Sequence, residues 1–139
     1  MVNFELPTAD HNKRISDIMN SAPEAHELWL KQKLKYSNEP TLRHRLRELW
    51  DKCPAAISGK LGAKNAFVGM TADTRNYWTH FGDDLKANAA TGEELCYLVV
   101  KLRILIQTCL LQELGFNSNE VELLMSKPLR ELTQRNQTP

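Results

Sequence analysis

The sequence lacks most of the patterns that mark strand-rich, fibrous or disordered proteins. It has six glycines and six prolines among 139 residues, and no low-complexity tract, which argues against a disordered or collagen-like chain. It contains neither an Asn-Gly hairpin turn nor a run of strict polar–apolar alternation, so no strands are predicted. With 42% hydrophobic and 25% charged residues, the composition is typical of one globular domain with one core.

Cysteine is scarce, and its arrangement excludes two common scaffolds. Cys53, Cys96 and Cys109 are an odd set without a Cys-x-x-Cys pair, so neither a disulfide framework nor a zinc site is predicted. Cys96 and Cys109 fall inside an apolar run, where a cysteine behaves as a small hydrophobic residue. We therefore expect free thiols in a reducing compartment, with no metal and no cofactor.

No segment is long and apolar enough to predict a membrane span. The longest apolar stretch, residues 95–114, carries Lys101 and Arg103 near its middle, which is costly in a bilayer. The N-terminus is polar and shows no signal peptide. The sequence therefore predicts a cytoplasmic protein without a membrane partner.

The net charge of +1 creates no global field, so binding to a polyanion must depend on a local patch. Two basic clusters are visible: Lys31, Lys33 and Lys35, and then Arg43, His44, Arg45 and Arg47. We interpret the first cluster as a solvated helix face. In the second, Arg43, His44 and Arg47 are candidate substrate-binding residues, because arginine is the better phosphate ligand.

Helix signals dominate the chain. The predicted helices cover residues 10–20, 21–35, 41–52, 64–82, 93–114 and 118–126, and a looser connection covers 53–62. The predicted fold is all-α, an up-and-down bundle of four to five main helices plus short extra helices. We divide the chain into a lead-in at 1–20, a helical domain at 21–126 and a polar tail at 127–139.

Apolar spacing also predicts which sides of these helices are buried. Leu28, Trp29 and Leu34 are expected to face inward from the second helix. Leu42, Leu46, Leu49 and Trp50 are expected to form one buried stripe on the third. Residues 93–114 are too apolar for a single stripe, so this segment is predicted to be a central helix buried on all sides.

One hexapeptide, Arg75-Asn76-Tyr77-Trp78-Thr79-His80, combines functional residue types in a single predicted helix. With Arg75 at zero on a helical projection, Asn76 falls near about 100° and His80 near about 140°. These three side chains therefore share a polar arc, with Thr79 inside it and Asp73 at its edge. The predicted packing face holds Phe67, Met70, Tyr77, Trp78 and Phe81.

The polar arc carries groups that suit RNA chemistry. Arg75 offers a planar cation for a phosphate, and His80 can exchange a proton near neutral pH. Asn76 can orient a hydroxyl or a phosphate oxygen. RNA supplies its own 2′-hydroxyl nucleophile, so an acid–base group and a charge stabiliser can suffice without metal. Such residues on an exposed helix are nevertheless more often solvated than catalytic, so the residues alone leave binding and cleavage both open.

The residues around the arc also have two interpretations each. Asp73 could orient His80 or pair with Arg75, or it could be a surface acid. Thr79 is a candidate substrate contact inside the arc. Tyr77 and Trp78 could stack on bases, but their apolar spacing favours core packing or a dimer contact.

The arrangement Arg-Asn-x3-His near the end of a helix resembles the motif of HEPN domains, and the resemblance extends beyond the hexapeptide. Residues 42–49, 73–81 and 110–116 are similar to the arginine-containing helix, the motif segment and the close of the long helix in the Apea-like branch. The likeness covers roughly residues 21–125.

The resemblance implies a helical bundle that pairs as a homodimer, often as a metal-independent endoribonuclease in toxin–antitoxin, abortive-infection or other antiviral defence. His80 would then act as general acid/base, Arg75 would stabilise the phosphate and Asn76 would position it. The products would be a 2′,3′-cyclic phosphate and a 5′-hydroxyl.

One alternative to a nuclease remains open. Some HEPN domains have lost activity and serve as RNA-binding, protein-interaction or dimerisation modules. An antitoxin, or other domains of a longer parent protein, are further expected partners.

Overall fold

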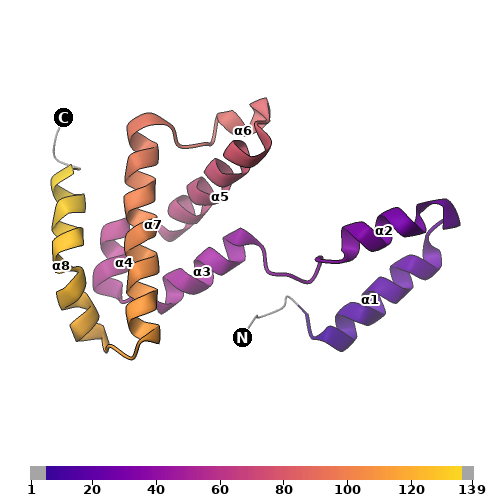
Figure 1. Cartoon of the computed structure of the whole chain (residues 1–139), viewed down its shortest axis with the longest axis horizontal. Coiled ribbons are helices and arrows are strands. Elements are labelled where there is room, and N and C mark those ends of the chain that lie inside the picture. Colours follow the sequence, from indigo (N-terminus) through magenta and orange to yellow (C-terminus); the bar gives the residue numbers. More distant parts are fainter. Residues whose placement is uncertain (1–5, 136–139) are drawn as a thin grey trace. The chain divides into compact units, whose positions relative to one another are not determined.

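The computed structural model describes residues 6–135, which form helices and contain no strand (Figure 1). The elements are α1 (Thr8–Ser21), the 3-10 helix η1 (Glu24–His26), α2 (Glu27–Leu34), α3 (Leu42–Lys52), α4 (Ala55–Leu61), α5 (Lys64–His80), α6 (Asp83–Lys86), α7 (Gly92–Glu113) and α8 (Ser118–Arg135). The all-α prediction is confirmed.

Contacts within the chain define two compact units, which divide between Thr41 and Leu42. In the first unit α1 contacts α2, and the Asn38 amide pairs with both backbone polar groups of Leu6, at 2.9 and 3.0 Å. All candidate site residues belong to the second unit. The domain limits 1–20, 21–126 and 127–139 stay a prediction.

The predicted burial of Leu28 and Trp29 in the first unit is wrong. Their side chains are 72% and 58% exposed. Leu34 is half-buried, as expected, and so is Leu30. Leu28 and Trp29 lie on a different side of α2 from Leu30. In a helix this short, sequence spacing gives little basis for predicting which side is buried. In α3, Leu42 was also predicted to face inward, but it is 39% exposed.

The second unit is built around one apolar core. Its fully buried side chains come from four helices and include Ile57, Leu61, Val68, Ile104, Leu105, Val121 and Leu132. Trp50 of α3 and Phe67 of α5 meet with ring centroids 5.3 Å apart. Ile57 and Leu61 lie in α4, within the segment predicted as a loose connection. That prediction is wrong, because a helix beginning after Pro54 buries both side chains.

Helix α8 begins with a reciprocal cap and continues further than predicted. Asn117 Oδ1 accepts the backbone N–H groups of Asn119 and Glu120, and the Glu120 carboxylate accepts the N–H of Asn117. This is a capping box centred on Asn117. The helix was predicted to end at Ser126, whereas it passes through Pro128 to Arg135.

Burial explains why α8 continues through a proline. Leu129 and Leu132 are 4% and 1% exposed and extend the buried stripe of Val121 and Met125. Burying two leucines is worth about 3–6 kcal/mol, which offsets the roughly 3 kcal/mol cost of an interior proline. The described part of the predicted polar tail is therefore helical and partly buried.

Helix α7 packs against α8 and α3, but it is not buried on all sides as predicted. Leu98, Ile104, Leu105, Thr108 and Cys109 are buried. The opposite side leaves large apolar side chains exposed: Val99, Ile106, Leu110 and Leu114. Cys96 is exposed too, which corrects its interpretation as a packed hydrophobic residue, whereas Cys109 is buried.

Candidate functional site

The motif lies at the end of α5 that extends beyond the core. The buried residues of this helix are Phe67, Val68, Thr71, Ala72 and Thr74, so burial stops just before Arg75. From Arg75 to Phe81 every side chain is exposed or half-buried. The fold therefore presents the whole hexapeptide at an accessible helix end.

The predicted packing face of α5 needs correction. Phe67 is buried, Met70 and Tyr77 are half-buried, and Trp78 and Phe81 are 49% and 64% exposed. The buried residues instead centre on Thr71 and Val68, because α3 packs on that side of the helix.

The exposed aromatic side chains pack on one another. Ring centroids of Tyr77 and Trp78 lie 5.3 Å apart, and those of Trp78 and Phe81 lie 6.1 Å apart, both edge-to-face. We call Tyr77, Trp78 and Phe81 the aromatic trio.

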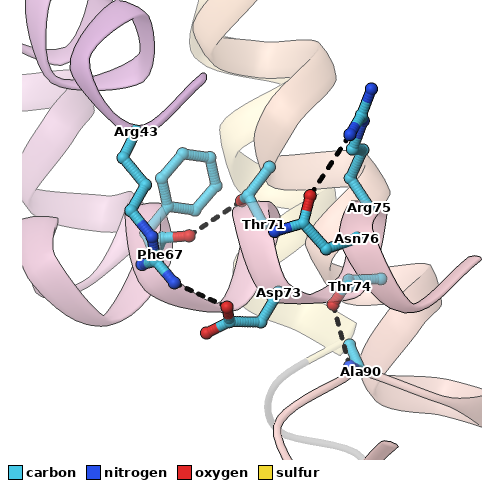
Figure 2. A network of polar contacts seen from close by, with 8 residues as sticks. All are labelled: Arg43, Phe67, Thr71, Asp73, Thr74, Arg75, Asn76 and Ala90. Carbon is cyan, nitrogen blue, oxygen red and sulfur yellow. Dashed lines mark hydrogen bonds and ion pairs between the residues drawn. The ribbon is translucent and has the colours of Figure 1, made fainter. Parts of the chain in front are cut away.

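The structure brings two of the three predicted catalytic side chains into direct contact. Arg75 Nη1 donates a hydrogen bond to Asn76 Oδ1 over 3.2 Å, as Figure 2 shows. His80 is the last residue of α5, four positions after Asn76, and its side chain is exposed. Residues four apart are neighbours on a helix surface. The guanidinium, the amide and the imidazole therefore lie on adjacent turns open to solvent.

The helix ends directly after His80 by an unusual backbone conformation. Phe81 has φ 51°, in the left-handed region, and its N–H donates to the Tyr77 carbonyl over 2.7 Å. A bulky residue rarely adopts this conformation.

The Thr79 hydroxyl donates a hydrogen bond to the Arg75 carbonyl over 2.7 Å. Its proton is therefore used within the helix, and a substrate could engage only its lone pairs.

A second polar network fixes α5 on its other side. The Thr74 hydroxyl accepts the N–H of Ala90 over 2.9 Å in a buried position, and the Thr71 hydroxyl donates to the Phe67 carbonyl over 2.8 Å (Figure 2). The first bond joins the helix directly before the motif to the segment that leads into α7.

Asp73 pairs with neither motif residue proposed for it. Its carboxylate accepts a 2.5 Å hydrogen bond from Arg43 Nη2 of α3, away from Arg75 and Asn76 in Figure 2. Of the other α3 candidates, His44 Nε2 lies 3.6 Å from Glu48 Oε1, and Arg47 is exposed. The structure thus joins Arg43 to the motif helix through Asp73.

A cavity of about 380 Å³ lies beside the Arg43–Asp73 pair, and the sequence analysis did not predict it. Its lining comes from α5, from the segment after α6 and from the first turn of α7: Asn65, Ala66, Gly69, Met70, Asp73, Ala87, Asn88, Ala89 and Glu94. The repeat of Asn65, Gly69 and Asp73 at four-residue intervals was an available signal for a polar, partly open helix face.

The two buried thiols are chemically quiet. Burial, together with the neighbouring Cys109, raises the pKa of Cys53 to about 11, against hydrogen bonds that lower it. Burial also raises the pKa of Cys109, whose Sγ lies 3.5 Å from the Leu49 carbonyl. A thiol held in its protonated form is a poor nucleophile, so neither cysteine is a candidate catalytic residue.

Among the side chains that the structure describes, no three from His, Cys, Asp or Glu are placed to hold a metal ion. In the same residues, no helix combines the length and apolar character needed to cross a membrane.

A comparison with protein families identifies the chain. The family described as Apea-like HEPN matches residues 3–120. The chain belongs to the Apea-like HEPN family. The match covers α1 to α7 and the first residues of α8, so it includes the first compact unit. No curated protein and no solved structure matches the chain.

Proposed function

We propose that this HEPN protein is a metal-independent endoribonuclease, with His80 as general acid/base and Arg75 and Asn76 as phosphate ligands. The observation that carries the proposal is the Arg75–Asn76 hydrogen bond on the exposed end of α5, with His80 on the next turn. A cation that is already oriented needs little reorganisation to bind a phosphate.

The reaction needs no group beyond the substrate and such side chains. The 2′-oxygen attacks the adjacent phosphorus and loses its proton to a base, while the P–O5′ bond breaks and the 5′-oxygen takes a proton from an acid. Arg75 stabilises the added charge on the phosphoryl oxygens. The products are a 2′,3′-cyclic phosphate and a 5′-hydroxyl.

The motif supplies only one imidazole from each chain, His80, which favours a homodimer in which the partner's copy of this histidine supplies the second proton-transfer group. The aromatic trio supports this arrangement, because Trp78 and Phe81 expose large apolar surfaces beside the motif. Covering such side chains is worth about 25 cal/mol per Å² of apolar surface. We place the nuclease in a cytoplasmic defence or toxin system, restrained by an antitoxin or by further domains.

The test is RNA cleavage in the presence of EDTA. Purified protein should cut single-stranded RNA and leave cyclic phosphate ends, and His80→Ala should lower the rate at least about 100-fold. His26→Ala is the matched control, since His26 is also an exposed histidine but lies in the first unit. Absence of cleavage, or equal cleavage by His80→Ala, contradicts the proposal.

A second function, a catalytically inactive interaction module, is favoured by a different surface. An apolar groove of about 320 Å³ lies between α7 and α8, lined mainly by Leu110, Leu111, Leu114, Leu124 and Pro128. Exposed apolar grooves of this kind suit a protein partner. This alternative predicts that the protein binds its partner without cleaving RNA, and that added salt changes the affinity for the partner little.

A further inference from the structure

The cavity beside Asp73 shares one face of α5 with the catalytic candidates. On an ideal helix Asn65, Gly69, Asp73, Asn76 and His80 fall within about 80° of one another. Asp73 lies about 10 Å from His80 along the helix axis. An RNA strand that follows this face can therefore present a phosphate to the motif and a neighbouring base to the cavity.

The charges of the cavity exclude a phosphate and favour a group that donates hydrogen bonds. Asp73 and Glu94 line it, and Asn65 and Asn88 add amides. Arg43 neutralises Asp73. The Glu94 carboxylate has no hydrogen bond or ion pair with the described part of the chain, so both of its oxygens are available as acceptors.

The size and the shape of the site suit a nucleobase. A volume of about 380 Å³ is near the lower end for small-molecule sites. Gly69 lines the site without adding a side chain to it. The side chains of Asn65, Asn88 and Glu94 are exposed, so a base can enter from solvent.

Among the bases, guanine best matches this set of groups. Its Watson–Crick edge presents two adjacent donors, N1–H and the 2-amino group, which one carboxylate can accept together, and an asparagine amide can donate to O6. We propose that this cavity is a guanine subsite in which Glu94 reads the base next to the scissile phosphate. The inference rests on the proposed ribonuclease function and gives it a sequence preference.

The test uses the full chain and RNA that it cannot cut. Oligouridylates with 2′-O-methyl groups throughout carry one central guanosine, inosine, adenosine or cytidine, and fluorescence anisotropy measures their affinities. The guanosine probe should bind about tenfold more tightly than the others. Inosine lacks the 2-amino group and should lose most of that advantage.

Two variants assign the preference to the cavity. Glu94→Gln should bring the guanosine and adenosine probes to equal affinity. Glu93→Gln, the matched control, removes the same charge from the adjacent exposed residue, which does not line the cavity, and should keep the preference. Equal affinity of all probes for the wild type, a preference that survives in Glu94→Gln, or binding of no probe overturns the guanine subsite.

The affinity measurements and the cleavage assay test the guanine subsite and the proposed nuclease separately. Cleavage in EDTA without a guanosine preference refutes the subsite and leaves the nuclease standing. A guanosine preference without cleavage supports the subsite and contradicts the nuclease.

Discussion

Thr74 and Ala90 are joined by a buried hydrogen bond, in which the threonine hydroxyl accepts the alanine N–H over 2.9 Å. The two residues are 16 positions apart, and the bond links the motif helix to the segment that enters α7. Because Thr74 directly precedes Arg75, this bond fixes the base of the exposed motif turns.

Replacing Thr74 by valine should therefore destabilise the protein. Thr74→Val keeps the shape but leaves the buried N–H of Ala90 unpaired, which costs about 1–3 kcal/mol. Urea denaturation measures the loss. Thr74→Ser keeps the acceptor and is the control. Equal stability of the valine and serine variants would show that the bond contributes nothing.

Substitution of Arg75 should weaken RNA binding, whereas substitution of His80 should slow RNA cleavage. Arg75→Ala removes one phosphate contact, so RNA affinity should fall and the slope of log K against log salt should decrease by about 1. His80→Gln should retain the affinity and lose the cleavage rate. A salt titration with uncleavable RNA and a single-turnover assay give the two values. The assignment fails if the two variants show the same profile.

The groove between α7 and α8 should affect association and not folding. Leu114 is 75% exposed and lines this groove, so Leu114→Ser should change the free energy of unfolding by less than about 0.5 kcal/mol. If the inactive-module alternative holds, the same change should weaken binding of the protein partner. Leu129→Ser, at a buried position of α8, is the contrasting variant and should destabilise the fold strongly.

Stability should fall in alkali through Cys53. The pKa of this thiol has its ordinary value of 9.0 in the unfolded chain, and burial raises it to about 11 in the folded protein, so above pH 9 the unfolded chain loses the proton first. The stabilisation from the protonated thiol is fully present below pH 9 and is lost as the pH rises to 11. The free energy of unfolding should fall by at most about 3 kcal/mol over this range. Denaturation of the wild type and of Cys53→Ala between pH 8 and about 11 checks this. Parallel pH curves for the two proteins would contradict it.

The sequence was sufficient to predict elements whose signal lies within a few neighbouring residues. The motif helix begins at Lys64, as expected, and Gly115 follows α7 with φ 93°, the left-handed conformation that a helix end favours. The polar arc of Arg75, Asn76 and His80 also follows from helical spacing alone. The grouping of these residues on exposed turns is therefore a local property of the chain.

Other features were not predictable because they depend on which neighbour covers each side. Trp29, Trp78 and Phe81 are apolar but exposed, which helical spacing by itself does not indicate. Helix α7 has enough apolar residues for complete burial but only part of its surface meets α3 and α8. Likewise Leu129 and Leu132 are buried beyond Pro128, because α8 packs on α7 and α4.

The candidate site thus has two origins. The sequence by itself determined that Arg75, Asn76 and His80 share a helix face, because helix periodicity depends only on nearby residues. Only the tertiary structure decided that Asp73 pairs with Arg43 and that a polar cavity opens beside them. Both require α3 and the segment before α7 to pack against α5, and such distant contacts are set by the burial of the whole core.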